Sequence, residues 1–435
     1  MSRLRALWWR IRSSLWFLPA LLVAGAVLLA VGLVELGALH DMNLQRRWPR
    51  LFGAGAEGAR GLLSAIATAM LTVAGTVFSI TLAVLSLAAS QYSPRVLRTF
   101  MDDRPTQVVL GVFVAVFAYC LLVLRTIREG EEPLVPSLAV LGGIVLAFVA
   151  VGFLVFFIHH LASSIAAPSI LQRVTRGTDA AVEDLFPEEL GDEADEVAVD
   201  GEADAIRAWA PVPAAETGYI VSLDSGALLA FAREQGRVVR MALAIGDYAL
   251  KGQPVAWLEG TRAVDAKAEK ALNACYSYNR ERTIEQDAAF GVQQLVDVAL
   301  KALSSGINDQ STAVMCIDQL TEVLVRVARR RIEKPYRRDD QGLRVIAIGP
   351  SFAGLVDAAF AGVRESGATM PAVLGRLLWA IERIAADTAN VHRRKVLAEQ
   401  AARIAECGAR GIAAPHERTR IVAQAEALGR KLRPA

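Results

Sequence analysis

The sequence predicts an α-helical membrane domain with four transmembrane helices, followed by a cytoplasmic α+β domain. Apolar residues are concentrated in the first 160 positions, strand-like segments follow residue 217, and long helical patterns fill the rest. The chain has 435 residues, and 54% of them are hydrophobic, which exceeds the usual share in soluble proteins. The formal net charge of +2 argues against nucleic acid as a partner.

Four apolar runs account for the first domain, which we place at residues 1–160. Each run is near or above the roughly 18–20 residues that a helix needs to cross about 30 Å of hydrocarbon. The first run is too long for a signal peptide and lacks a convincing cleavage site, so we expect a retained anchor. The runs are Trp16–Leu36, Leu62–Ala89, Val108–Leu124 and Pro136–Ile158.

Arginines near the ends of the spans set the expected orientation, because positive charges favour the cytoplasmic side. They are more frequent beside the N-terminus, after the second span and after the fourth span than in the two other loops. An even number of spans then places both termini in the cytoplasm. The four cysteines lie far apart without a C-x-x-C pair, which predicts neither a zinc site nor a disulfide framework.

The second half divides into three expected segments. The first continues the helix of the fourth span and ends in an acidic linker, and the second is a small β module. The third is a helical domain with breaks near Pro335–Gly349, at Gly367–Pro371 and near Pro415. The boundaries that we predict for these segments are 161–216, 217–262 and 263–435.

The β module contains the turn G-D-Y-A-L-K-G-Q-P, which resembles the turn of biotinyl- and lipoyl-type barrel-sandwich domains. Those domains carry their cofactor on a lysine in a later hairpin. Here Trp257-Leu258-Glu259 runs into a polar segment without that lysine turn. We therefore expect a small barrel-sandwich-like β module but no bound cofactor.

The second span carries a row of serine and threonine residues, which we call the hydroxyl stripe. At about 100° per residue its members fall within one third of the helix circumference. Such hydroxyls either line a water-filled path or pack closely against another helix in a dry seam. As pore-lining residues we predict Ser64, Thr68, Thr72, Thr76, Ser79, Ser86 and Ser90.

Charged residues follow the stripe at the expected cytoplasmic end of the second span. Arg95 and Arg98, with Asp102 and Asp103, either anchor the span or form an electrostatic ring at a pore mouth. Their charges nearly balance, so they do not indicate the sign of an ion. His159-His160 ends the fourth span, and adjacent helical residues point about 100° apart, which favours interfacial anchoring over a metal site.

The sequence contains none of the common nucleotide-binding, zinc-protease or hydrolase motifs, and we expect no enzymatic activity. A helical pattern over Arg282–Leu303 places Asp287 and Asp297 on one polar face. These carboxylates are ten residues apart, or about 15 Å along a helix, which is too far for a shared catalytic site.

The stretch S-S-G-I-N-D-Q (Ser304–Gln310), which follows this pattern, predicts a corner between two helices. Gly306 suits a left-handed cap after Leu303, and Asp309 can cap a helix that starts near Gln310. Asn308 and Asp309 also leave polar groups that could meet a ligand or another subunit. We predict these three residues as a signature turn of the cytoplasmic domain.

Two long motifs, Phe78–Phe100 and Arg282–Asp309, resemble the bacterial family of predicted membrane proteins called domain of unknown function 2254. The resemblance extends over nearly the whole chain. Members typically carry S-P-G-I-N-D-P in the turn, whereas Ser305 and Gln310 replace both prolines here. The resemblance implies a shared fold and a location in the bacterial inner membrane rather than a particular reaction.

Two functional hypotheses follow. The first is a homo-oligomeric ion channel or small-solute pathway lined by the hydroxyl stripe, with the cytoplasmic domain as a vestibule or gate. One polar stripe in four spans cannot enclose a wet pore, so several copies around an axis are needed. The alternative is a membrane-tethered sensing, interaction or scaffold protein in which the stripe is a packing seam.

Overall fold

The computed structural model describes residues 17–39, 55–91, 103–128, 135–164, 167–185, 192–193, 208–330, 336–339 and 342–433. The chain forms two compact units, Met1–Ser169 and Ile170–Ala435. We call them the N-terminal unit and the C-terminal unit and describe each by itself.

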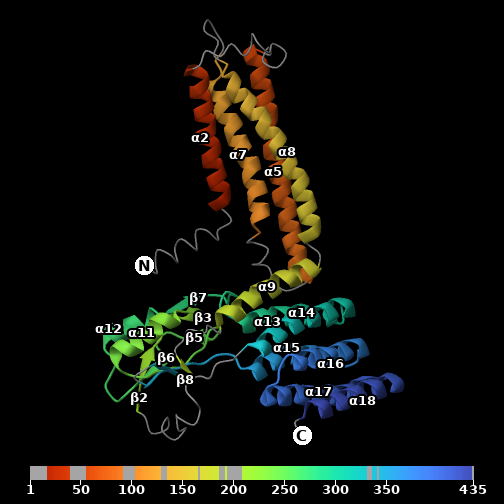
Figure 1. Ribbon diagram of the computed structural model, residues 1–435. Coiled ribbons are helices and arrows are strands. Elements are labelled where there is room, and N and C mark those ends of the chain that lie inside the picture. Colours follow the sequence, from red (N-terminus) through yellow and green to blue (C-terminus); the bar gives the residue numbers. More distant parts are fainter. Residues whose placement is uncertain are drawn as a thin grey trace. The chain divides into compact units, whose positions relative to one another are not determined.

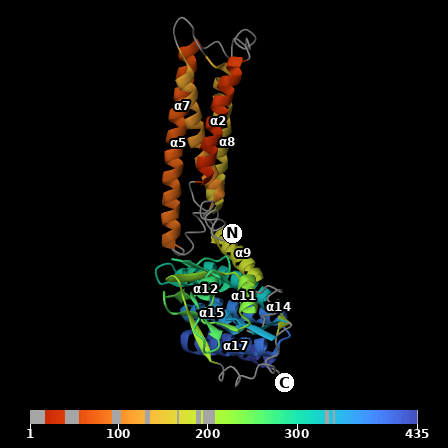
Figure 2. The same cartoon turned by 90° about the vertical axis from the view of Figure 1, so that its left-hand side faces the viewer.

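The described residues of the N-terminal unit include four long helices, which run side by side in both views (Figures 1 and 2). All four are long and apolar enough to cross a membrane, which confirms the four apolar helices predicted from the sequence. They are α2 (Phe17–Leu39), α5 (Gly55–Gln91), α7 (Arg104–Thr126) and α8 (Ser137–Ser164).

Helix α7 is the centre of this unit, because it packs against each of the other three helices. Its buried side chains include Phe113 and Tyr119. At Gly111 the absence of a side chain lets α2 approach closely, since a Cβ there would lie 2.9 Å from the Cα of Pro19. Tyr119 donates a hydrogen bond of 2.7 Å to the carbonyl oxygen of Ala139, which ties α7 to α8.

The C-terminal unit contains two sheets. One has six strands in the order β1-β8-β9-β4-β6-β2, all antiparallel except the β4–β9 pair, and the other is antiparallel with the order β5-β3-β7. The strands are β1 (Asp192–Glu193), β2 (Trp209–Pro213), β3 (Gly218–Leu223), β4 (Val239–Met241), β5 (Tyr248–Ala249), β6 (Pro254–Glu259), β7 (Tyr276–Asn279), β8 (Tyr336–Asp339) and β9 (Gly342–Ile346).

These sheets do not confirm a barrel-sandwich module. The strands within 217–262 are divided between the two sheets, and both sheets also take strands from outside that range. A shared apolar core holds them together, with Ile220, Leu228 and Leu258 fully buried. The sheets therefore depend on pairings between segments that are distant in the sequence.

The rest of the C-terminal unit is helical. Consecutive helices form three pairs, α13/α14, α15/α16 and α17/α18, which stack on one another in Figure 1. The expected breaks at Gly367–Pro371 and near Pro415 are confirmed. The helices are α9 (Ala167–Leu185), α11 (Ser225–Gln235), α12 (Ala266–Asn273), α13 (Ala288–Leu303), α14 (Gln310–Arg329), α15 (Phe352–Ser366), α16 (Pro371–Ala386), α17 (Val391–Gly411) and α18 (Pro415–Leu432).

The corner between α13 and α14 confirms one predicted cap and corrects the other. Asp309 caps α14, because its carboxylate accepts hydrogen bonds from the backbone N–H of Thr312 at 3.0 Å and from its hydroxyl at 2.6 Å. The prediction of a left-handed Gly306 is wrong, since Asn308 takes that conformation with φ 51°. The Asn308 N–H donates to the carbonyl oxygen of Ser304, so the left-handed residue comes directly before the capping residue Asp309. Asparagine tolerates the left-handed conformation better than most residues do.

We expect Asp309→Ala to lower the free energy of unfolding by about 1 kcal/mol, because it removes the N-cap of α14. Asp309→Asn keeps an acceptor in the same place and should change it little. Thermal or denaturant unfolding of the purified full chain in detergent measures both. Equal losses in the two variants would contradict the capping role.

Candidate functional site

The hydroxyl stripe lies on the exposed side of α5. Six of its members, Ser64, Thr68, Thr72, Thr76, Ser79 and Ser86, have exposed side chains. The side chain of Ser90 lies outside the described residues. The buried face of α5, which includes Leu63, Ala67, Met70, Ala74 and Val77, is on the opposite side at about 100° per residue.

The stripe is as long as a membrane is thick. Ser64 and Ser86 are separated by 22 positions, or about 33 Å at 1.5 Å per residue, against about 30 Å for the hydrocarbon core. Acyl chains offer no hydrogen-bond donors to the hydroxyl oxygens of a row that points away from the chain's own core. Water or another protein surface therefore fits this face better than acyl chains.

Two threonines of the stripe, Thr72 and Thr76, satisfy their hydroxyl donors within the helix. Thr72 donates to the carbonyl oxygen of Thr68 at 2.9 Å, and Thr76 donates to that of Thr72 at 3.0 Å. The lone pairs of their oxygens remain available as acceptors. Gly75 has no side chain and lies on the same face beside open space, since a Cβ there would meet no atom within 4 Å. The face thus offers oxygen acceptors and room for close approach.

Two hollows border the stripe. One, of about 540 Å³, is lined by Glu57, Arg60, Ser64 and Leu124 at the start of α5, where the stripe begins. The other, of about 480 Å³, lies between α5 and α8 and is almost wholly apolar apart from Thr76. The stripe therefore begins beside charged groups and passes an apolar groove further along.

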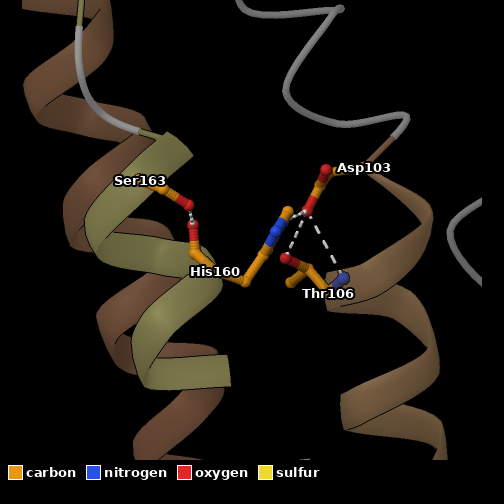
Figure 3. Close-up of polar contacts among 4 residues, drawn as sticks. All are labelled: Asp103, Thr106, His160 and Ser163. Carbon is orange, nitrogen blue, oxygen red and sulfur yellow. Dashed lines mark hydrogen bonds and ion pairs between the residues drawn. The ribbon is translucent and has the colours of Figure 1, made fainter. Parts of the chain in front are cut away.

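Only one of the four expected pore-mouth residues can be placed. Arg95, Arg98 and Asp102 lie outside the described residues. Asp103 caps α7 by accepting from Thr106, at 3.3 Å from the backbone N–H and 2.6 Å from the hydroxyl. The same carboxylate oxygen lies 2.7 Å from Nε2 of His160 on α8, as Figure 3 shows.

The Asp103–His160 contact joins the start of α7 to the end of α8. The imidazole stacks on Phe156 with the rings 11° from parallel. Ser163 donates to the carbonyl oxygen of His160 at 2.9 Å (Figure 3). The sequence favours interfacial anchoring for the histidine pair, and the structure adds a contact between His160 and Asp103. No local pattern indicates this contact, because the partners are 57 residues apart.

In the C-terminal unit the motif that begins at Arg282 contacts several other elements. We call residues Arg282–Gln294 the signature segment. The expected helix over Arg282–Leu303 is too long, since α13 begins only at Ala288. The helix starts there because Asp287 caps it by accepting from the backbone N–H of Phe290 at 2.9 Å. The residues before Asp287 are thereby free to contact the sheets.

Asp287 is buried and paired with Arg282, whose Nη2 and Nε lie 2.7 and 2.9 Å from the same carboxylate oxygen. Burial raises the pKa of Asp287, and the Arg282 guanidinium opposes this rise. Gly246, at the turn before β5, covers the pair with φ +93°, and a Cβ there would lie 2.5 Å from the carboxylate. Gln286 accepts from the Leu223 N–H at 2.9 Å. The signature segment thus holds both β3 and the β5 turn.

Helix α9 packs against the signature segment. Gly291 of α13 lies directly against Thr178 of α9, and a Cβ at position 291 would be 2.8 Å from the Cβ of that threonine. Gly177 lies over Ile284, where a Cβ would be 3.5 Å from the isoleucine Cγ2. The signature segment therefore joins three parts of the C-terminal unit, namely α9, the sheet region and the helical stack.

Neither the cysteines nor the possible metal ligands indicate a site among the described residues. The four cysteines are buried and free. No group of three or more His, Cys, Asp and Glu side chains that could hold a metal ion occurs among the described residues.

Residues 12–383 match the family described as predicted membrane protein, domain of unknown function 2254 (DUF2254). The chain belongs to this family. It is 33% identical over 440 residues to an uncharacterized protein of Mycobacterium tuberculosis (strain CDC 1551 / Oshkosh), covering 98% of this chain and 82% of the relative. An uncharacterized protein of Mycobacterium bovis is 32% identical with the same coverage. No solved structure matches the chain.

The two motifs that resemble the DUF2254 family have different structural positions. The first includes the last part of α5, where the hydroxyl stripe ends, and the second forms the signature segment and the α13–α14 corner. In this DUF2254 member the second motif is thus an assembly element, and the hydroxyl stripe is the candidate functional surface.

We expect Gly291→Ala to destabilise the C-terminal unit by about 1–3 kcal/mol, because the added methyl group overlaps Thr178. The better helix propensity of alanine offsets about 1 kcal/mol of this loss. Gly306→Ala is the matched control, since its Cβ would meet no atom within 4 Å. Unfolding measurements on the full chain test the pair, and a neutral Gly291→Ala would contradict the close packing.

A double-mutant cycle with Asp103→Ala and His160→Ala should give a coupling energy of about 0.5–3 kcal/mol for contacting side chains. Thermal unfolding in detergent provides the four free energies. His159→Ala serves as the control, because the neighbouring histidine is exposed and its loss should change stability by less than about 0.5 kcal/mol. Simple additivity at positions 103 and 160 would refute the contact.

Proposed function

We propose that the chain is a subunit of a homo-oligomeric ion channel or small-solute pathway in the bacterial inner membrane. The observation that carries this proposal is the exposed hydroxyl stripe on α5, which extends over a full membrane thickness opposite the buried face of the helix. Copies arranged around an axis would bring their α5 helices together and enclose the stripe.

The chemistry of the stripe supports a polar permeant. The hydroxyls of Thr72 and Thr76 donate into the helix, so the lone pairs of their oxygens remain available as acceptors. Acceptor oxygens replace the hydration shell of a cation and also bind water or a neutral polar solute. Within one copy the described interior around α7 is apolar apart from Gln107 and the hydroxyl of Tyr119, whereas the outer face of α5 carries a continuous row of hydroxyls.

We place both termini and the C-terminal unit in the cytoplasm. The larger number of arginines beside the N-terminus and after the second and fourth spans supports this orientation. The C-terminal unit would then act as a vestibule or gate. We assign the chain no catalytic step and no cofactor.

The inward bonding of Thr72 and Thr76 also favours a second candidate, a membrane-tethered sensing, interaction or scaffold protein without transport. Hydroxyls that are satisfied within their own helix pack well in a dry seam between copies. The two candidates share an oligomer and differ in whether the stripe is wet.

The double variant Thr72→Leu, Thr76→Leu should abolish conductance or solute flux through purified protein in a planar bilayer or liposome. The two leucines would replace acceptor oxygens with bulky apolar groups at the middle of the pathway. Gly152→Leu is the matched control, because a side chain there meets open space on α8, away from the stripe.

Wild-type protein that conducts nothing under any ion gradient or pH would contradict the channel and favour the dry seam. A monomer in the membrane, measured by mass photometry or cross-linking, would contradict both candidates that depend on copies meeting at α5.

A further inference from the structure

Helix α9 buries two polar groups that lack partners. The hydroxyl oxygen of Thr175 and Oδ1 of Asp179 have no hydrogen-bond partner among the described residues. Both residues are buried, with exposed fractions of 3% for Thr175 and 6% for Asp179. They are four residues apart, which puts them on one face of the helix, one turn from each other.

The other carboxylate oxygen of Asp179 shares its counter-ion with a second acid. Oδ2 lies 3.2 Å from Nη2 of Arg326 on α14, and the same nitrogen lies 3.1 Å from Glu322. The arginine side chain is 45% exposed, so water weakens its charge at this site. Glu183, one turn further along α9, is another nearby acid and contacts Arg330 at 3.6 Å. Arg326 thus divides its charge between Asp179 and Glu322, while Glu183 has Arg330 as its counter-ion.

The neutral form of Asp179 suits this buried position better than the ionised form. A buried carboxylate with one oxygen lacking a donor is costly, whereas a carboxylic acid is neutral and gains a hydroxyl. Protonation therefore removes the buried charge at an oxygen that has no donor.

We propose that Asp179 is a proton-binding site that sets how firmly α9 packs against α13 and α14, with tighter packing in the protonated form. The site belongs to the helix that follows the fourth apolar helix, because only two residues separate the end of α8 from the start of α9. The inference does not depend on α5 lining a pore. It makes the contact between α9 and the signature segment responsive to pH.

The direction of the pH effect follows from the pKa. Burial raises the pKa of Asp179 from 3.8 to about 6, Arg326 opposes the rise, and Glu322 and Glu183 add to it. Docked α9 therefore binds the proton more tightly than released α9 does. The extra stability is present at low pH and is lost as pH rises through about 6. Between about pH 5 and about pH 7.5 the docking equilibrium should fall about tenfold.

Hydrogen exchange of the α9 amides in the full-length protein, corrected for the intrinsic pH dependence, measures this equilibrium. In the wild type we expect protection to fall about tenfold between the two pH values. Asp179→Asn is neutral and should abolish that dependence while keeping strong protection at the higher pH. Glu183→Gln, on the same helix, should retain a pH dependence with its midpoint at lower pH, because Glu183 adds to the rise of the Asp179 pKa.

Infrared difference spectra between the two pH values give a second readout. We expect the carbonyl band of a protonated carboxylic acid at the lower pH, absent in Asp179→Asn. Protection independent of pH, or equal loss of protection in Asp179→Asn at both pH values, would overturn the proposal and leave a structural ion pair. Restoration of wild-type protection by sodium or potassium ions, but not choline, at the higher pH would also overturn it, because a cation would then be the ligand.

Discussion

The close approach of Gly291 to Thr178 is the constraint on which the architecture of the C-terminal unit depends. Without a side chain at position 291, α9 lies directly on α13. This contact places Asp179 beside Arg326 and lays Gly177 over Ile284. The preceding residues of the signature segment are then available to hold β3 and the β5 turn through Gln286 and Asp287. One glycine thus allows a single segment to join α9, the sheets and the helical stack.

A corresponding constraint operates in the N-terminal unit, where α7 packs against all three other helices. Because α7 takes the central place, α5 contributes only one face to the core and leaves the opposite face exposed. That exposed face carries the hydroxyls. The described part of the unit therefore combines a largely apolar interior with a row of hydroxyls on its exposed side.

Features that depend on local periodicity and length could be predicted from the sequence. Four apolar runs predicted four helices, and the cap at Asp309 followed from an acidic residue directly before a helical pattern. The hydroxyl stripe followed from the helical period alone. The choice between Gly306 and Asn308 for the left-handed residue could not be made this way, because both types tolerate that conformation and the backbone bonds of the turn decide it.

Contacts between distant segments could not be predicted. Asp103 and His160 meet only because α7 and α8 are neighbours, and Gly291 meets Thr178 only after α9 docks. Likewise the strands of 217–262 entered two sheets because their partners lie elsewhere in the chain, at β2, β7 and β9. Burial of Asp179, and hence the rise of its pKa, is a property of that docking and leaves no pattern in the sequence.

The central claim, that the stripe faces water inside an oligomer, is tested most directly by cysteine accessibility along α5 in membranes. The native thiols are buried and should contribute little background. We predict that a membrane-impermeant thiol reagent labels cysteines at positions 64, 68, 72, 76, 79 and 86 but not at the apolar positions 71 and 78. Absence of labelling at every stripe position would show a dry seam and contradict the account.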